Sequence, residues 1–133
     1  MNIGEAAARS GLNNKTIRYY ESLGLVASRR LANGYRDYSE KDTQQLLFLQ
    51  RARAVGFSLE ECRELLELYR DPGRRSAEVK ALVLDRVGQL DRQLAELQAM
   101  RETLMGMAEH CAGDEDPDCA IIDTLAEPKF KLV

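Results

Sequence analysis

The stretch Gly11-Leu-Asn-Asn-Lys-Thr-Ile-Arg-Tyr-Tyr-Glu-Ser-Leu-Gly24 decides the fold of the N-terminal part of this chain. Asn13 is a good N-cap, because its side chain can accept a hydrogen bond from a free N–H group of the first helical turn, and Gly24 is a typical helix end. The stretch therefore predicts a helix over about 14–23. A second short helix, predicted over 3–10, ends at the glycine that opens the stretch. Two short helices joined by a glycine-containing turn are typical of a helix-turn-helix.

A β-hairpin is predicted directly after these two helices. Asn33-Gly34 is a strong signal for a tight two-residue turn, in which both residues take positive φ. Basic and aromatic side chains flank the turn, so the ribbon can lie along a phosphate backbone as a wing. The second helix of the pair would meet base edges and phosphates with the residues near its N-terminal half, which are Lys15, Thr16, Arg18 and Tyr19.

Two further helices are predicted after the wing. Ser39 begins the first and Gly56 ends it, and the capping-box pair Ser58 and Glu61 begins the second. Asp71-Pro72-Gly73 is a clear stop. The apolar residues expected on the inward face of the first of these helices are Leu46, Leu47, Leu49 and Ala52.

Residues 76–109 predict one long helix, because they contain no proline and only two interior glycines. Its apolar residues recur with alternating spacings of four and three, and Arg101 and Ala108 fill the remaining positions of the seam. A helix of this length spans about 50 Å, too far to fold back on one small domain. Pairing with a second helix is therefore favoured, and packing within its own domain is the alternative. The apolar positions are Val83, Val87, Leu90, Leu94, Leu97 and Leu104.

The charge of the chain is unevenly distributed. Residues 1–53 carry nine Lys and Arg against five Asp and Glu, a balance of +4, whereas residues 54–133 carry ten against seventeen, a balance of −7. A basic N-terminal part is consistent with a nucleic-acid partner, although an ordinary solvated surface could explain the same count. No apolar run reaches the length of about 18–20 residues that spans a membrane, and the N-terminus lacks a signal-peptide core, so we expect a cytoplasmic protein without a membrane partner.

Two of the three cysteines, Cys111 and Cys119, lie close together near the C-terminus, with seven residues between them. An odd cysteine count without a secretion signal disfavours a disulfide framework and favours thiols used for metal binding or redox chemistry. A pair of thiolates selects soft ions such as Cu(I). Zinc prefers four ligands, and His110 with the neighbouring aspartates keeps it open as an alternative. Cys62 is interpreted as a small packed hydrophobe.

The chain resembles the MerR family of transcription regulators, and within it the copper-efflux regulators of the CueR type. The resemblance extends from Met1 to about Leu125. The motifs that carry it are Asn2-Ile-Gly-Glu-Ala-Ala7, Thr16-Ile-Arg-Tyr-Tyr-Glu21 with Gly24-Leu25, Asn33-Gly-Tyr-Arg36, Arg53 with Gly56-Phe57, Asp71-Pro72, Ser76-Ala-Glu-Val-Lys80 and the loop from Cys111 to Cys119.

This resemblance implies a mainly α fold. It consists of a winged helix-turn-helix DNA-binding domain (1–70), a linker (71–75), a long helix (76–109) that forms an antiparallel coiled coil with its twin, a metal-binding loop with a short helix (110–126) and a tail (127–133). It implies a homodimer on a two-fold-symmetric operator of double-stranded promoter DNA, where metal binding distorts the DNA and activates transcription by RNA polymerase. The residues implied to contact DNA are Lys15, Arg18, Tyr19, Tyr35 and Arg36, followed by Arg29, Arg30 and Arg53.

The resemblance also narrows the choice of metal. Sensors of divalent ions in the family have a cysteine from the other protomer where this chain has Ser76, so the site is expected to hold Cu(I), or alternatively Ag(I) or Au(I), between two thiolates. Lys80 and the start of the long helix would compensate the remaining negative charge. Ala120, where many copper-type relatives have proline, could loosen the loop. A silver- or gold-biased sensor, a divalent-metal sensor and a thiol-disulfide redox sensor stay open.

An enzyme is not expected. The single histidine lies next to Cys111 without an orienting partner, and the chain has no glycine loop for phosphate binding.

Overall fold

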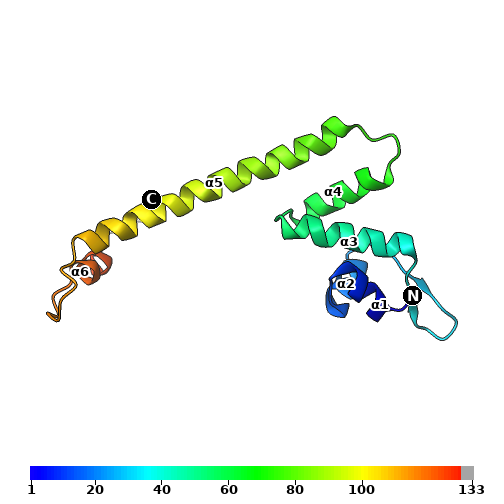
Figure 1. The fold of residues 1–133 in the computed structure, drawn as a ribbon, viewed down its shortest axis with the longest axis horizontal. Helices are drawn as coiled ribbons and strands as arrows, with labels where there is room; N and C mark the ends of the chain where they lie inside the picture. The colour runs from blue at the N-terminus through cyan, green and yellow to red at the C-terminus, as the bar shows by residue number, and fades with distance from the viewer. Residues whose placement is uncertain (130–133) are drawn as a thin grey trace. The chain divides into compact units, whose positions relative to one another are not determined.

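The computed structural model describes residues 1–129, so residues 130–133 of the predicted loose tail lie outside the described part. The chain forms two compact units, Met1–Arg86 and Val87 onward, and the division falls inside its longest helix. Figure 1 shows the elements in chain order. The described secondary structure is helical except for one two-stranded ribbon, which confirms the expected mainly α fold.

The predicted helix-turn-helix is present as α1 (Ile3–Ser10) and α2 (Asn14–Ser22). The Asn13 side chain accepts a hydrogen bond from the Thr16 N–H at 2.7 Å, as its N-cap position requires. Gly11 ends α1 with a φ of 75°, a left-handed conformation that glycine adopts without steric cost. Ile17 and Tyr20 of α2 are buried, which fixes the face that α2 turns outward.

The wing is formed by β1 (Arg29–Arg30) and β2 (Arg36–Asp37), which pair antiparallel. The prediction of a two-residue turn with positive φ at both positions is wrong. Of Asn33 and Gly34, only Gly34 has a positive φ, of 84°. The Gly34 N–H donates to the Leu31 carbonyl and the Leu31 N–H donates to the Tyr35 carbonyl, the pattern of a three-residue hairpin loop that ends in a left-handed glycine. The Asn33 side chain accepts from the Tyr35 N–H instead.

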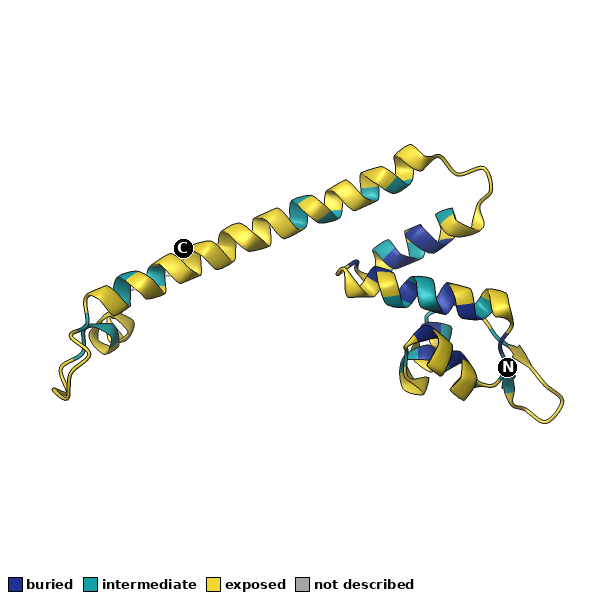
Figure 2. Cartoon of the chain, viewed as in Figure 1, coloured by how far each residue is buried: buried dark blue, intermediate teal, exposed yellow. Residues whose placement is uncertain are grey.

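The core of the first unit is built largely by α3 (Glu40–Ala54) and α4 (Leu59–Arg70). Each helix begins with a capping box, and the N-caps are Ser39 and Ser58, the helix starts that the sequence predicts. Figure 2 shows the buried residues gathered on the facing sides of these helices and on α1 and α2. Leu46, Leu49 and Ala52 are buried, whereas Leu47, expected beside them, is only half-buried. Gln45 is buried instead, because Arg70 donates two hydrogen bonds to its side-chain oxygen.

The long helix is α5 (Ser76–Glu109), with the bounds that the sequence predicts, and a short helix α6 (Ala120–Ala126) follows it after a loop. Val79 and Leu82 pack against the core of the first unit. Every residue of the predicted apolar stripe is exposed, Leu94 and Leu104 to 64%. No described helix is long and apolar enough to cross a membrane.

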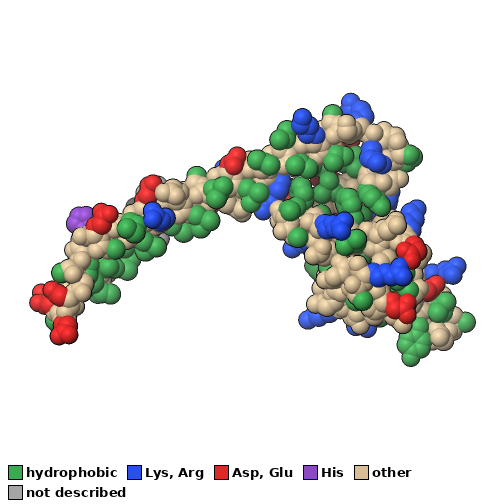
Figure 3. Space-filling model, viewed as in Figure 1, with side chains coloured by type: hydrophobic (Ala, Val, Ile, Leu, Met, Phe, Trp, Pro, Cys, Tyr) green, Lys and Arg blue, Asp and Glu red, His purple; other side chains and the backbone are tan. Residues whose placement is uncertain are grey.

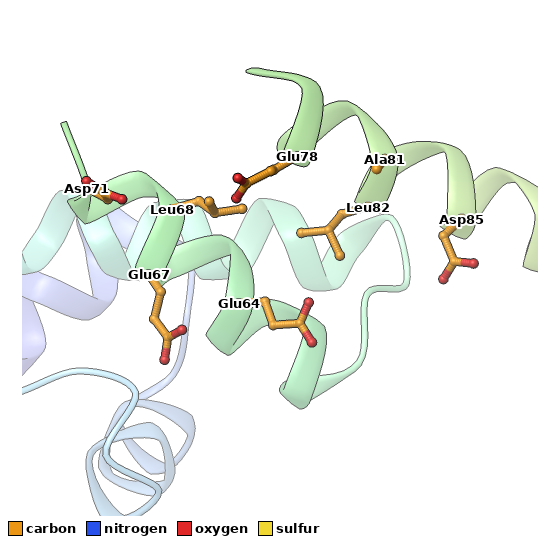
Figure 4. Close-up of a pocket in the computed structure, with 8 residues that line it drawn as sticks. All are labelled: Glu64, Glu67, Leu68, Asp71, Glu78, Ala81, Leu82 and Asp85. Atoms are coloured by element: carbon orange, nitrogen blue, oxygen red, sulfur yellow. The ribbon is translucent and has the colours of Figure 1, made fainter. Parts of the chain in front are cut away.

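An open cavity of about 590 Å³ lies within the first unit, between α4 and the first turns of α5 (Figure 4). Most of its lining side chains are carboxylates, and Leu68 and Leu82 lie between the two helices. Carboxylates repel phosphate, so this side of the unit is a poor surface for DNA. The lining residues are Glu64, Glu67, Leu68, Asp71, Glu78, Ala81, Leu82 and Asp85.

Candidate nucleic-acid interface and metal centre

The outward face of α2 presents the polar residues expected at DNA. Lys15 and Arg18 are exposed, and among the described residues neither forms an ion pair or a hydrogen bond through its side chain. Tyr19 is 51% exposed, and Thr16 is half-buried beside the helix N-terminus. Four residues of mixed charge, hydroxyl and aromatic character on one short helix can contact both phosphates and base edges.

Two arginines of α4 that sequence reasoning missed hold the segment after α2. Arg63 donates to the Leu23 carbonyl and Arg70 to the Leu25 carbonyl, both at 2.7 Å. Leu23 is the C-cap of α2, and a cation near a helix C-terminus is favourable. The spacing of seven residues between the two arginines puts them on one face of α4, which was the available signal in the sequence. These contacts fix where α2 ends and where the wing begins.

The wing exposes one aromatic and two basic side chains. Tyr35 is 73% exposed near the tip, and the Arg29 side chain is 82% exposed although it lies 3.6 Å from the Asp37 carboxylate. Arg30 donates to the Gly34 carbonyl at 3.1 Å across the hairpin loop. A surface ion pair as open as that of Arg29 is weak, so its guanidinium can exchange this partner for a phosphate.

Arg36 differs from the other expected DNA contacts, because its Nε donates to Glu21 at 2.7 Å and its side chain is only 27% exposed. The Tyr38 hydroxyl donates to the other Glu21 oxygen at 2.5 Å. Burial raises the pKa of Glu21, but the hydrogen bonds from Tyr38, Ser28 and Arg36 and the charge of Arg36 outweigh it and hold that pKa below its ordinary value. The same burial, with the hydrogen bond to Glu21, raises the pKa of Tyr38 to about 12. Arg36 thus ties the wing to α2.

Arg53 likewise has an internal role. Its Nη1 donates to the Phe57 carbonyl at 2.6 Å, which closes the turn between α3 and α4. Its contact with DNA stays a prediction.

Cys111 and Cys119 are brought together by the loop between α5 and α6. Their Sγ atoms are 3.5 Å apart, and both residues are half-buried. This separation fits one shared ion, since two sulfur ligands about 2.3 Å from a metal can be at most about 4.6 Å apart. The thiolate is the form of cysteine that binds metals.

Cys119 occupies the N-cap position of α6. Its side chain makes no capping hydrogen bond. The pKa of Cys119 is nevertheless lowered, first by the nearby Ile122 N–H and then by the Cys111 thiol, because both stabilise the thiolate. The positive end of the α6 dipole acts in the same direction. The local fold thus favours the thiolate form of one of the two sulfurs.

The acidic residues of the loop shape it. The Asp114 carboxylate accepts from the Asp116 N–H at 3.0 Å, the Asp116 carboxylate accepts from the Asp118 N–H at 2.9 Å, and Gly113 has a φ of 67°. His110 Nδ1 contacts the Gly106 carbonyl at 2.6 Å. Figure 3 shows the Asp and Glu side chains at this end of the chain. Nowhere in residues 1–129 do three or more His, Cys, Asp or Glu side chains form a group able to hold a metal ion, which weakens the zinc alternative within one chain.

Cys62 is separate from this site. It is fully buried on α4, its Sγ lies 3.9 Å from the Phe57 carbonyl, and burial raises its pKa. The interpretation as a packed hydrophobe is confirmed by this burial.

Ser76 and Lys80 are exposed residues in the first turns of α5, whereas Cys111 follows the end of that helix. At 1.5 Å per residue the two ends of a 34-residue helix are about 50 Å apart. The family resemblance implies a role for these residues at the metal bound by a second copy. That role stays a prediction.

Comparison with known proteins shows the family to which the chain belongs. The family described as "MerR HTH family regulatory protein" matches residues 1–68, and the family described as "MerR, DNA binding" matches residues 43–107. The chain belongs to the MerR family. As a MerR-family protein it is a DNA-binding transcription regulator, and its relatives are regulators rather than enzymes, as the sequence led us to expect.

MerR-family relatives match over nearly the whole chain. The HTH-type transcriptional regulator HmrR of Rhizobium leguminosarum bv. viciae is 50% identical over 127 residues, which are 96% of this chain and 98% of that protein. The HTH-type transcriptional regulator CueR of Salmonella typhi is 50% identical over 127 residues, 95% of this chain and 92% of that protein. PbrR691 of Ralstonia metallidurans CH34, solved in complex with lead(II), is 36% identical with a TM-score of 0.82, covering 95% of this chain and 99% of that one.

Proposed function

We propose that this MerR-family regulator senses a monovalent soft metal ion, Cu(I) first and Ag(I) or Au(I) as further ligands, with Cys111 and Cys119. The observation that carries the proposal is the pair of half-buried Sγ atoms 3.5 Å apart, with no third ligand from the described residues of the same chain. Soft thiolates select Cu(I), which tolerates low coordination, whereas zinc prefers four ligands.

The ion would act on promoter DNA bound by the first unit in the cytoplasm. Most of the residues proposed to touch DNA lie on α2 and the wing, with Lys15, Arg18 and Tyr19 as base and phosphate contacts and Arg29 and Tyr35 along the flanking backbone. The support is their exposure on an element whose other face is buried. Thr16, Arg30, Arg36 and Arg53 complete the proposed set, Arg36 and Arg53 also holding their elements in place.

A homodimer is proposed because the described residues of one chain leave the α5 stripe exposed. About six helical turns of exposed apolar residues, from Val83 to Leu104, would be covered by a partner helix with the same spacing. An antiparallel arrangement would bring Ser76 and Lys80 of one copy to the thiol pair of the other. The DNA-binding heads of the two copies (residues 1–70 of each, which are α1 to α4 with the wing) would then bind a two-fold-symmetric operator. Metal binding would change the shape of that operator, so that RNA polymerase can use the promoter.

The preference for a +1 ion rests on charge. Two thiolates with a monovalent ion leave a net charge of −1, and with a divalent ion they leave none. A buried negative charge is costly unless it is compensated, and Lys80 with the N-terminal end of α5 would compensate it. Because one relative of known structure was solved in complex with lead(II), a sensor of divalent ions is the alternative hypothesis.

Replacing the serine tests this competition. Ser76→Cys should widen the transcriptional response toward divalent ions, because it adds a third thiolate, while Ser76→Ala should keep the wild-type metal profile. An unchanged profile for Ser76→Cys would count against the role of this position.

The deciding experiment for the site is X-ray absorption of the chain loaded anaerobically with Cu(I). We expect a first shell of two sulfur atoms in the wild type and in the matched control Cys62→Ala, and no such shell in Cys111→Ser. The Cys111→Ser variant should also lose metal-activated transcription while its operator binding changes little. Loss of DNA binding in that variant would contradict the separation of the two sites.

A thiol-disulfide sensor is the second candidate function, favoured by the short Sγ to Sγ distance. Closing a disulfide would need the sulfurs to approach to about 2.05 Å. Transcription that responds to peroxide, but not to Cu(I) under anaerobic reducing conditions, would favour the redox sensor over the metal sensor.

A further inference from the structure

Arg86 joins α5 to the turn between α3 and α4. Its Nε donates to the Val55 carbonyl at 2.9 Å, and Val55 is the C-cap of α3. A guanidinium at this position satisfies a free carbonyl at the end of a helix and complements the negative end of the helix dipole. This contact lies wholly within the first unit, of which Arg86 is the last residue.

Gly56 lets the guanidinium approach this closely. A Cβ atom added at this glycine would lie 2.1 Å from Arg86 Nη2 and 2.7 Å from Cζ, and the residue has a φ of 88°. The positive φ disfavours an ordinary side chain at this position, and an added Cβ atom would push aside the Arg86 guanidinium, which is the flexible end of that side chain. The turn is thus shaped to receive Arg86.

Further contacts hold the same turn to the core. Arg53 donates to the Phe57 carbonyl, the Phe57 N–H donates to the Ala52 carbonyl, and the Phe57 side chain is buried. A displacement of the Val55 carbonyl would therefore be transmitted to α3 and α4 rather than absorbed by the turn. Those two helices build the core that supports α2.

A movement of α5 would displace its Arg86 contact more than its apolar contacts with the core. Among the described residues of α5, Val79 and Leu82 pack on the core, and Arg86 lies one turn further along. Arg86 is ten residues beyond Ser76, about 15 Å along the axis. A rotation of α5 about its N-terminal end therefore displaces Arg86 more than the two apolar contacts.

We propose that Arg86 is a positioning residue that couples α5 to the DNA-binding head, and that the metal signal reaches α2 through its contact with Val55 and Gly56. This inference rests on the proposed function for its signal, since the ion binds beyond the far end of α5. The contact itself, however, can be tested without metal.

The first test is amide hydrogen exchange of the full-length, metal-free protein bound to its operator. Arg86→Gln should raise exchange about tenfold at the amides of Gly56 and Phe57 and leave α1 unchanged, because loss of a charged hydrogen bond opens the turn locally. Arg86→Lys keeps a charged donor and should change exchange much less. Arg92→Gln, further along α5 in the second unit, is the matched control and should match the wild type. Exchange that rises equally throughout the first unit, or not at all, would overturn the proposal.

The second test is Cu(I)-dependent transcription in vitro. Arg86→Gln should lose at least about fivefold of the induction while Cu(I) stoichiometry and operator affinity are kept, since coupling between sites is typically worth 5–150-fold. Induction equal to that of Arg92→Gln would overturn the coupling role. If the unchanged protein itself shows no induction, the proposed metal function fails, and the exchange measurement decides on the Arg86 contact alone.

Discussion

The head of the molecule buries its apolar residues, whereas the long helix α5 leaves its apolar stripe exposed. In the first unit Leu46, Leu49 and Leu66 are at most 1% exposed, whereas the stripe of α5 leaves Leu94 and Leu97 more than half exposed. The head therefore has its own core and can hold α2 and the wing rigid. The stripe becomes stable only when another surface covers it. Binding DNA needs the first property, and joining two copies needs the second.

The largest effect should come from a charge placed in the stripe. Leu94→Glu would bury two carboxylates in an antiparallel dimer and forfeit two leucine contacts, each worth about 1.5–3 kcal/mol. We expect a monomer in sedimentation equilibrium and loss of the metal response. Ala99→Glu adds the same charge on the opposite face of α5 and should stay dimeric. A dimeric Leu94→Glu variant would break the comparison between the two regions.

A cavity in the head should lower stability without changing assembly. Leu49→Ala removes a fully buried side chain and should cost about 2–5 kcal/mol of unfolding free energy. Urea unfolding of the Leu49→Ala variant should show this loss, and its dimer dissociation constant should stay near that of the wild type. The truncation Leu94→Ala should show the reverse, with a weaker dimer and a head of normal stability. Equal behaviour of the two variants would contradict the division.

Operator binding should depend on the outward face of α2. Arg18→Ala is expected to weaken binding by about 1–3 kcal/mol if Arg18 reads a base. If it contacts phosphate, the loss is similar for all sequences and the slope of log K against log salt falls by about 0.9 for each copy. Fluorescence anisotropy at several salt concentrations measures both, with Arg92→Ala as the control. Unchanged affinity would remove Arg18 from the interface.

The smallest effect concerns the contact between α2 and the wing. The pKa of Glu21 is lowered in the folded protein, so its contribution to stability is fully present above its unfolded value and is lost as the pH falls through the folded pKa. Glu21→Gln should therefore lower the unfolding free energy by about 1 kcal/mol at pH 7. The difference from the wild type should shrink when unfolding is repeated below about pH 4, within the range where the pKa values of carboxyl groups lie. A constant difference across pH would contradict this role of Glu21.

Local signals in the sequence were enough to place the elements. Asn13, Ser39 and Ser58 predicted three helix starts, and Asp71-Pro72-Gly73 separated α4 from α5. These signals work because a cap satisfies free N–H groups within the next turn and needs no distant partner. The hairpin turn was misread because Asn33-Gly34 is compatible with both a two-residue and a three-residue loop, and only the strand register separates them.

The pairing of Cys111 with Cys119 could also be predicted from their short separation in the chain. The roles of Arg36, Arg63 and Arg70 could not, since each arginine donates to a residue at least 15 positions away. The same holds for Arg86, which is 31 residues from Val55. An arginine in an exposed pattern looks the same in sequence whether it meets a phosphate or a carbonyl.

What the sequence by itself determined is the set of elements, the unpaired stripe of α5 and the presence of two thiols in one short loop, because all of these follow from periodicity, caps and proximity along the chain. Only the tertiary structure decided which basic residues remain available to DNA and which are engaged inside the head. The physical reason is that hydrogen bonds and ion pairs depend on atoms brought within about 3–4 Å of each other. Those distances are set by the packing of the core.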